Sequence, residues 1–180
     1  MIVLRDIKKT RLTGSAVTIG KFDGVHKGHD LLLTLLKGDS LKKVIFTFNA
    51  AKGTPLETDS AIDDEERKIR LLSSYDPDYI IVYPFGKHEA NMSPKRFVRA
   101  VLCRKLGMKR IYTGPDFRFG KKGRGDINML RNLGKKYGFE VVVKDKVRYE
   151  GEDISSTRIR KELKEGHIKE AREMLGREEI

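Results

Sequence analysis

The chain has 180 residues, of which 36% are charged and 38% hydrophobic, and its formal net charge is +12. This length suits one domain, with room for a small second lobe. The basic charge fits nucleic acid, an acidic membrane surface or small polyanions such as nucleotides, but lysine and arginine are spread along the chain, so nucleic acid is not expected.

Cysteine usage and hydropathy narrow the class of protein further. The single cysteine, Cys103, excludes an internal disulfide and a cysteine-based zinc site, and its apolar neighbours predict a buried side chain. No apolar run reaches the ~20 residues of a membrane span, and no signal-like region opens the chain. We therefore expect a cytoplasmic protein without a membrane partner, and the sequence leaves its oligomeric state open.

Apolar runs typical of strands alternate with amphipathic runs typical of helices. Strands are expected at residues 16–19, 44–48, 79–83, 110–113 and 140–143, and helices at 26–36, 64–74, 93–106, 127–137, 157–165 and 168–175. This alternation, with strands rich in Val and Ile, predicts an α/β fold with an open, doubly wound parallel sheet. Such sheets bind ligands beyond the carboxyl ends of their strands, which directs attention to the loops at 20–29, 49–63 and 114–126.

The first of these loops is a glycine-rich turn that leads from a strand into a helix. His26 and His29 lie three residues apart and share one face of the first helical turn. A helix N-terminus offers free N–H donors and a partial positive charge, and Gly24 and Gly28 allow a ligand to approach the backbone. The turn therefore predicts a phosphate site, with capping or surface histidines as the alternative.

Residues 154–160 place hydroxyl side chains at a second predicted helix start, followed within one turn by Arg158 and Arg160. Backbone N–H groups, hydroxyls and a guanidinium together can hold phosphate oxygens. The alternative is an ordinary Ser or Thr cap with exposed arginines. In the third loop, Phe117 and Phe119 either pack on the core or form a platform for a flat aromatic ligand.

Several enzyme classes are excluded by missing motifs. The chain has no GxxxxGK[ST] phosphate loop, no GxGxxG turn, no nucleophile elbow and no triad of zinc ligands. Two phosphate sites and an aromatic loop at one sheet edge then suggest a nucleotide substrate, a flat cosubstrate, and phosphate chemistry without a covalent intermediate.

Residues 20–29 resemble the HxGH motif of the nucleotidyltransferase superfamily, and with Phe22-Asp23-Gly24 they look like the adenylyltransferase module of bacterial FAD synthetases. Residues 116–120 and 154–160 match that family's second and third signatures, the third continuing at Gly166, Ala171 and Leu175-Gly176-Arg177. The resemblance spans residues 15–177. It implies a Rossmann-like fold and the reaction of ATP with FMN, in the presence of Mg²⁺, to give FAD and pyrophosphate.

The resemblance also implies roles for individual residues. On the ATP side, His26 and His29 contact phosphates, and Ser156, Thr157 and Arg160 hold the triphosphate from the opposite side and stabilise departing pyrophosphate. The nucleotide pocket is shaped by the turn residues Gly20, Phe22, Asp23, Gly24 and Gly28. On the flavin side, Phe48 and Phe119 flank the isoalloxazine, and Asp116 lies near the FMN phosphate or the metal, whose ligands are not assigned.

The chain departs from the family pattern in two places. Residues 48–52 read Phe-Asn-Ala-Ala-Lys where the family usually has a Phe-Asp/Glu-Pro-His-Pro type of segment. The chain also stops just after Leu175-Gly176-Arg177, where most members continue into a riboflavin kinase domain. We therefore expect a single nucleotidyltransferase domain over residues 1–180 that does not phosphorylate riboflavin.

Two alternatives stay open at this point. The acceptor of another nucleotidyltransferase could be nicotinate mononucleotide, phosphopantetheine, or a sugar or polyol phosphate. A non-catalytic flavin- or nucleic-acid-binding protein on the same fold is the second alternative.

Overall fold

The computed structural model describes residues 1–57 and 60–180. Its centre is a six-stranded sheet in the order β1-β4-β3-β2-β5-β6, and all five neighbouring pairs are parallel. The strands are β1 (Ile2–Leu4), β2 (Ser15–Ile19), β3 (Lys42–Ala50), β4 (Tyr79–Phe85), β5 (Met108–Thr113) and β6 (Glu140–Val143). The predicted open parallel sheet is thus confirmed, with β1 as an additional edge strand.

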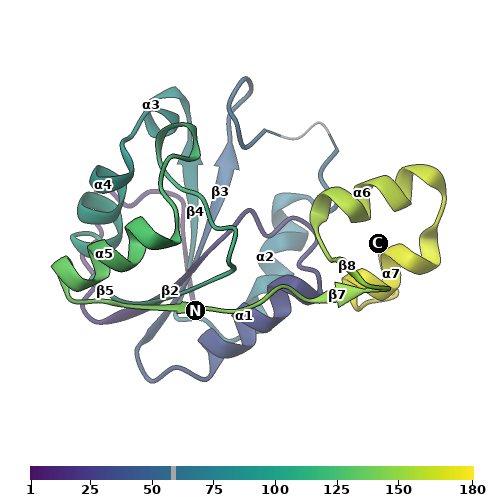
Figure 1. Ribbon diagram of the computed structural model, residues 1–180, viewed down its shortest axis with the longest axis horizontal. Helices are drawn as coiled ribbons and strands as arrows, with labels where there is room; N and C mark the ends of the chain where they lie inside the picture. Colours follow the sequence, from purple (N-terminus) through teal and green to yellow (C-terminus); the bar gives the residue numbers. More distant parts are fainter. Residues whose placement is uncertain (58–59) are drawn as a thin grey trace.

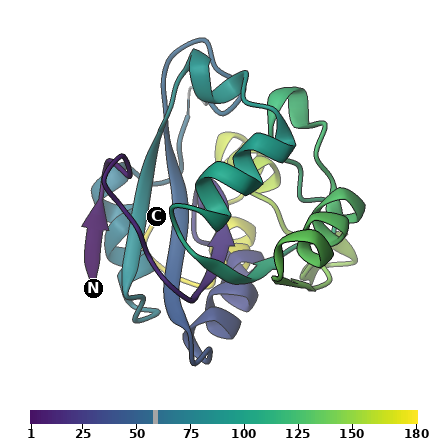
Figure 2. The same ribbon diagram turned by 90° about the vertical axis from the view of Figure 1, so that its left-hand side faces the viewer.

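Helices cover both faces of this sheet (Figures 1 and 2). They are α1 (Lys27–Lys37), α2 (Glu65–Ser73), α3 (Lys87–Ala90), α4 (Pro94–Arg96), the π-helix η1 (Phe97–Cys103), the 3₁₀-helix η2 (Lys121–Gly123), α5 (Ile127–Tyr137), α6 (Ser156–Glu165) and α7 (Ile168–Leu175). Helices α1 and α2 pack on one face, and α4, η1 and α5 on the other (Figure 1). A short hairpin, β7 (Arg148–Tyr149) and β8 (Glu152–Asp153), precedes α6.

The alternation of side chains along the strands divides the core into two layers. Val17 and Phe46 face η1 and α5, whereas their neighbours Ala16 and Ile45 face α1 and α2. Because successive strand residues point to opposite faces, a strand covered on both sides buries every residue, as β2 does. Its two hydroxyl residues, Ser15 and Thr18, are satisfied by donating to the carbonyls of Leu106 and Tyr112.

A third apolar cluster joins α6 to α7 and forms the small C-terminal lobe. Its buried members are Ile154, Ile159, Ala171, Met174 and Leu175. The lobe lies on the α1 and α2 side of the sheet, opposite α4 and α5 (Figure 1). Each of its helices ends at a glycine with positive φ, Gly166 at +83° and Gly176 at +72°.

The strand order places a topological switch point between β2 and β5. The chain moves outward from β2 through β3 to β4, and then returns to lay β5 along the other side of β2. The loops that leave the carboxyl ends of β2 and β5 therefore diverge and open a crevice between them. These are the loops at residues 20–26 and 114–126, two of the three selected from the sequence.

Several sequence-based expectations need correction. The helix predicted at 93–106 is divided into α4 and the π-helix η1, which ends at Cys103. Cys103 is only partly buried, because the stripe facing the core consists of Phe97, Val98, Val101 and Leu102, and Cys103 lies at its edge. The loop at 49–63 includes residues 58–59, which lie outside the described residues.

Candidate active site

The backbone of the turn after β2 is strained, and its own side chains hold it in place. Phe22 and Val25 have φ values of 49° and 38°, which are unfavourable for residues with a Cβ, above all for a β-branched one. Both side chains are buried in the layer beneath α1. Gly24 has φ +87°, and a Cβ there would lie 2.9 Å from Ile62 Cδ1, so this position needs glycine for its conformation and for space.

The turn ends on a pair of stacked histidines. The rings of His26 and His29 have centroids 3.7 Å apart and planes 18° from parallel. A Cβ at Gly28 would approach two atoms of the His26 ring at 3.1 Å, so the absence of a side chain there lets the ring lie over the first turn of α1. Phe22 supports His29 from below in an edge contact at 5.1 Å.

The histidines do not serve as helix caps. His26 occupies the N-cap position of α1, but its side chain makes no capping hydrogen bond. The Nδ1 atoms of His26 and His29 are both buried without a hydrogen-bond partner among the described residues. Since a buried N–H without an acceptor is unfavourable, the ring proton is better placed on Nε2, where it can be donated to a ligand.

Burial also sets the charge of these rings. Desolvation lowers the pKa of His26 to about 4, against an opposing effect of Asp23. Desolvation and the neighbouring His26 lower the pKa of His29 well below its usual value. Both imidazoles are therefore neutral at pH 7 in the free protein and present themselves as donors rather than as cations.

The start of α6 is joined directly to the histidine turn. Arg160 Nη1 donates to Asp23 Oδ2 at 2.5 Å, and Ser156 Oγ donates to the Asp23 carbonyl oxygen at 2.7 Å. The second oxygen of Asp23, Oδ1, accepts from the Ile62 amide at 2.8 Å, so this buried carboxylate is paired on both sides. Thr157 is exposed, and its hydroxyl accepts from Arg160 Nη2 at 3.2 Å.

Not every polar residue of the second motif faces the turn. Ser155 is the N-cap of α6 and accepts from the Arg158 amide at 3.2 Å. The Arg158 guanidinium donates to the carbonyls of Tyr149 and Glu152 and so fixes the β7–β8 hairpin. The capping interpretation thus holds for Ser155, while Ser156 and Arg160 carry the contacts to the turn.

A second arginine ties the C-terminal end of the chain to the same turn. Arg177 donates from Nη1 to the Gly24 carbonyl, and from Nη2 to both oxygens of Asp63 at 2.7 and 2.9 Å. The Asp63 carboxylate is fully buried and is also within 3.1 Å of Arg67 Nε. Residue-level reasoning assigned no role to Arg177 or Asp63, because their positions are 114 residues apart.

The crevice beside the turn contains an apolar pocket of about 360 Å³. Phe117 and Phe119 form one wall as a stacked pair with centroids 5.5 Å apart, and Phe48 and Phe85 meet edge to face at 5.6 Å. Phe119 is 6% exposed and also packs near Phe97, so it belongs to the core and to the pocket at once. Phe48 and Phe119, the two aromatic candidates, do line one cavity.

The pocket has lining residues that the sequence did not single out. They come from the end of β4, from the helix after it and from the segment after β3, and are Tyr83, Phe85, Glu89, Ala90, Met92, Pro55 and Leu56. Phe85 is hard to find because the apolar run was expected to stop at residue 83, whereas the strand continues to Phe85. Gly20 lines the edge of the pocket nearest the turn, whereas Phe22 is buried beneath it.

Two partly buried lysines lie near Asp23 of the histidine turn. Lys21 lines the pocket, and its pKa is lowered by burial and by Arg160, against the attraction of Asp23. Lys68 donates to the Phe48 carbonyl at 3.4 Å, and its pKa is lowered chiefly by burial. Sequence reasoning missed both, although Lys21 stands inside the motif between Gly20 and Phe22.

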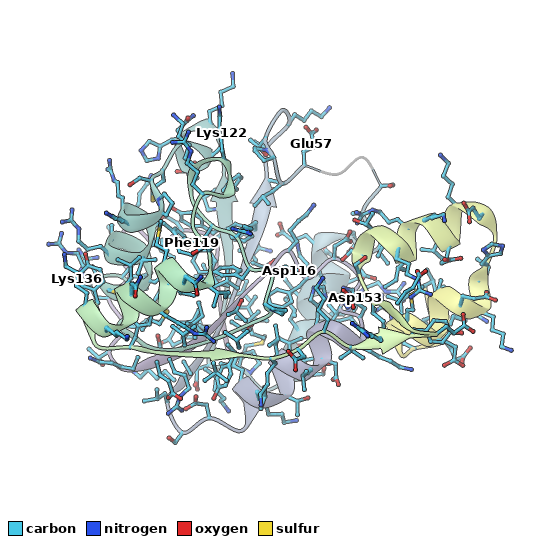
Figure 3. All side chains as sticks on the ribbon, in the orientation of Figure 1. Glu57, Asp116, Phe119, Lys122, Lys136 and Asp153 are labelled. Carbon is cyan, nitrogen blue, oxygen red and sulfur yellow. The ribbon has the colours of Figure 1, made fainter. Side chains whose placement is uncertain are left out.

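Asp116 is exposed and forms an ion pair with Lys146, which also lies 2.9 Å from Asp153 (Figure 3). The two carboxylates raise the pKa of Lys146 and tie the loop after β5 to β8. Phe119, by contrast, is buried in the body of the domain, and Lys122 of the same loop lines the aromatic pocket (Figure 3). The role of Asp116 beside a phosphate or metal stays a prediction.

One group of possible metal ligands occurs in the described part of the chain, and it is remote in sequence from His26 and His29. Glu162, Glu165 and His167 offer atoms within 4.8 Å of one another at the end of α6. His167 Nδ1 is already within 2.7 Å of Glu162 Oε2, and the group is largely exposed. We assign no metal to it.

A sequence model of a known family covers most of this architecture. The model described as FAD synthetase matches residues 8–158, which include the histidine turn, the aromatic loop and the start of α6. The chain belongs to the FAD synthetase family. The α/β fold and the placement of the motifs at the switch point agree with that membership.

Curated relatives of this chain are longer than the chain itself. A bifunctional riboflavin kinase/FMN adenylyltransferase from Buchnera aphidicola is 36% identical over 97% of this chain and 58% of its own length. A FAD synthetase from Listeria monocytogenes is 32% identical over 90% of this chain and 68% of its own length. The chain thus spans little more than half of the bifunctional relative.

Solved structures support the fold. A crystal structure described as a macrolide-efflux protein from Streptococcus pneumoniae is similar with a TM-score of 0.83 and 28% identity, over 98% of this chain and 60% of that one. A pantoate-beta-alanine ligase from Francisella tularensis has a TM-score of 0.61 and 15% identity, over 94% and 77% of the two chains. No helix in the described residues is long and apolar enough to cross a membrane.

Proposed function

We propose that this chain is an FMN adenylyltransferase, which transfers the AMP group of MgATP to FMN and releases FAD and pyrophosphate. The observation that carries the proposal is the direct contact between the histidine turn and α6, made by Asp23 with Arg160 and Ser156, next to an aromatic pocket. Family membership and the names of the relatives support the same activity.

The ATP phosphates fit between the start of α1 and the side chains of α6. The amides of Lys27 and Gly28 have no acceptor among the described residues, and the helix dipole favours an anion at this end. The Nε2–H groups of His26 and His29 donate from one side. Thr157 and Arg160 approach from the other, where the guanidinium neutralises charge that develops on pyrophosphate.

The flavin fits the neighbouring pocket. Its walls offer flat aromatic faces of Phe48, Phe117 and Phe119, and apolar clefts of a few hundred Å³ are typical of small-molecule sites. This placement directs the phosphate end of FMN toward Gly20 and Lys21, at the boundary between the pocket and the turn. Lys21 then supplies the cation that receives the FMN phosphate.

The reaction requires no covalent intermediate on the protein. An oxygen of the FMN phosphate, already anionic at pH 7, attacks the α-phosphorus of ATP, and the bond from that phosphorus to the bridging oxygen of the β-phosphate breaks. Pyrophosphate departs with the electron pair of that bond. Alignment and charge neutralisation therefore supply the catalysis, as is usual in phosphoryl and nucleotidyl transfer.

The proposal is limited to adenylyl transfer by a single nucleotidyltransferase domain. The riboflavin kinase activity in the names of the bifunctional relatives is not proposed for it, because those relatives are matched over little more than half of their length. Mg²⁺ enters with the triphosphate, since this ion usually keeps several waters and binds through substrate phosphates. The nearby carboxylate of Asp23 is already paired with Arg160.

The test is an assay of purified protein with FMN and MgATP, read by separation of FAD from FMN and by pyrophosphate release. We expect FAD and pyrophosphate in equal amounts. His29→Ala should lower the rate by about 10²-fold, as the loss of a transition-state donor does. The control is His88→Ala, which removes a largely exposed histidine outside the site.

Three outcomes would contradict the proposal or a part of it. Flavin binding without turnover would favour a non-catalytic protein. Adenylylation of nicotinate mononucleotide, phosphopantetheine or a sugar phosphate in place of FMN would move the activity to another acceptor. An unchanged rate in His29→Ala would exclude the phosphate role of the histidines.

A further inference from the structure

The net charge of the chain is concentrated in one part of the fold. Residues 87–139 contain fifteen lysines and arginines and three acidic residues, a difference equal to the +12 of the entire chain. This segment runs from α3 to α5. The rest of the chain is therefore neutral overall, although its basic residues are spread through the sequence.

Five of these cations line a hollow between the α4–η1 helix and the end of α5. The hollow has a volume of about 550 Å³, and its cationic lining residues are Lys95, Arg96, Arg99, Arg104 and Lys136. All five side chains are exposed, and none of them forms an ion pair with a described residue. Such uncompensated like charges repel one another, so an anion bound in the hollow relieves an existing cost.

The π-helix helps to place three of these cations on one side. Arg99 and Arg104 are five residues apart, which in an α-helix sets side chains about 140° apart around the axis. Here the Arg104 amide donates to the Arg99 carbonyl at 3.1 Å, the i to i+5 bond of a π turn, which brings the two residues nearer to a common side. Arg96 precedes Arg99 by one turn, and all three line the hollow.

The basic surface defined by these five residues is separate from the proposed active site. None of its lining residues also lines the aromatic pocket. Figure 3 places Lys136 at the end of the molecule away from Asp153 and the C-terminal lobe, with Asp116 between them. The proposed adenylyl transfer therefore leaves this surface without a role.

We infer that the basic surface binds the phosphate backbone of a single-stranded nucleic acid. A positively charged groove with an aromatic side chain is the usual form of such a site, and Tyr137 lies in the lining beside Lys136. A protein partner would require apolar anchors, but the large apolar residues that are exposed in the described chain are Met1, Ile2, Ile168 and Ile180, all outside residues 87–139. A flat bilayer surface cannot follow a hollow between two helices, whereas a thin linear polyanion can.

The experiment measures binding of the full chain to fluorescent oligonucleotides of about 20 nucleotides, poly(U) and poly(dT), from about 0.05 to about 0.2 M salt. Five phosphate contacts predict a slope of log affinity against log salt of about −3.5. Removing three charges in Arg96→Gln/Arg99→Gln/Arg104→Gln should reduce the slope by about 2 units and weaken binding about 100-fold near 0.1 M salt. Equal binding of the two oligomers indicates backbone recognition, and a preference for poly(U) indicates contacts to the ribose hydroxyl.

The matched control is Lys42→Gln/Lys164→Gln/Lys169→Gln, which removes the same charge from exposed positions outside the basic surface. It should bind nearly as the parent does, and thermal melts should show that both variants are folded. The inference is overturned if neither oligomer binds, if both triple variants weaken binding equally, or if polyglutamate or vesicles with anionic lipids bind as tightly as the oligonucleotides. FAD synthesis is measured separately, so failure of either proposal is seen without the other.

Discussion

The neutral histidines predict a distinct dependence of stability on pH. The pKa of His26 is lowered from 6.5 to about 4 by burial in the folded protein. Between these two values the unfolded chain binds more protons than the folded one, so the free energy of unfolding rises with pH across this window. The penalty from this residue is absent above about pH 6.5 and complete below about pH 4.

The size of the effect follows from the shift. About 2.5 pKa units correspond to about 3 kcal/mol in total, of which about 2 kcal/mol is present by pH 5. His29 acts in the same direction, because its pKa is lowered as well. Replacing His26 by Asn removes the titration, so the variant should lose less stability than the parent as the pH falls.

The assay is urea unfolding of the parent and His26→Asn at pH 7.5, 6, 5 and about 4.5, with stability compared at each pH. The control is His167→Asn, because acidic neighbours raise the pKa of His167, led by the hydrogen bond that the ring donates to Glu162. Protonated His167 stabilises the fold at pH values below the pKa it has in the unfolded chain, and this contribution is lost as the pH rises through its raised pKa in the folded protein. His167→Asn should therefore lose more stability than the parent as the pH falls, the opposite of His26→Asn. A difference between parent and His26→Asn that stays constant with pH would refute the reasoning.

Four further predictions concern the site. Binding of ATP at pH 6 should take up protons, because the phosphates raise the pKa of the histidines. The measurement is the binding enthalpy by calorimetry in two buffers of different ionisation enthalpy, and equal binding enthalpies in the two buffers would contradict the prediction. Gly28→Ala should slow FAD formation by about tenfold or more with little loss of stability, since a Cβ would lie 3.1 Å from the His26 ring; an unchanged rate contradicts this. Arg177→Met should destabilise the fold by about 3 kcal/mol in urea, because it leaves the buried Asp63 carboxylate with Arg67 alone, and a change below about 1 kcal/mol would argue against the anchor. Lys21→Met should raise the KM for FMN by about tenfold or more without altering riboflavin binding, because riboflavin lacks the phosphate. The control is Lys122→Met, which removes another cation of the pocket lining. If Lys21→Met weakens FMN and riboflavin equally, Lys21 does not bind the FMN phosphate.

The elements that could be predicted from the sequence are those whose periodicity is unambiguous. Strand β2, expected at 16–19, spans Ser15–Ile19 and is buried throughout, and β6 matches its expected bounds of 140–143. The hairpin of β7 and β8 was missed because two-residue strands carry no period. The π-helix was missed because its apolar stripe also fits an α-helix, and only the i to i+5 hydrogen bonds distinguish them.

The candidate site was predictable as separate motifs, but not as an assembly. The glycines and histidines of the turn can be read locally, because each has a conformational or chemical reason within ten residues. The bond from Arg160 to Asp23 joins positions 137 residues apart, and the one from Arg177 to Gly24 joins positions 153 apart. The concentration of net charge in residues 87–139 was readable in the sequence but was overlooked, because lysine and arginine are spread along the chain and it is the scarcity of acidic residues that sets this segment apart.

The long-range arginines explain why the turn can stay strained. Positive φ at Phe22 and Val25 opposes folding, and such backbone persists only where surrounding contacts over-determine it. Arg160 holds the turn at Asp23 and Arg177 holds it at the Gly24 carbonyl, and both come from the C-terminal lobe beyond the last residue of the family match. Because the same lobe presents Thr157 and Arg160 to the phosphates, loosening it would release the histidines and the opposing side chains together. A substitution that weakens the α6–α7 contact should therefore lower the rate of transfer before it weakens flavin binding, since the aromatic pocket is built from the sheet and the loops after β3, β4 and β5.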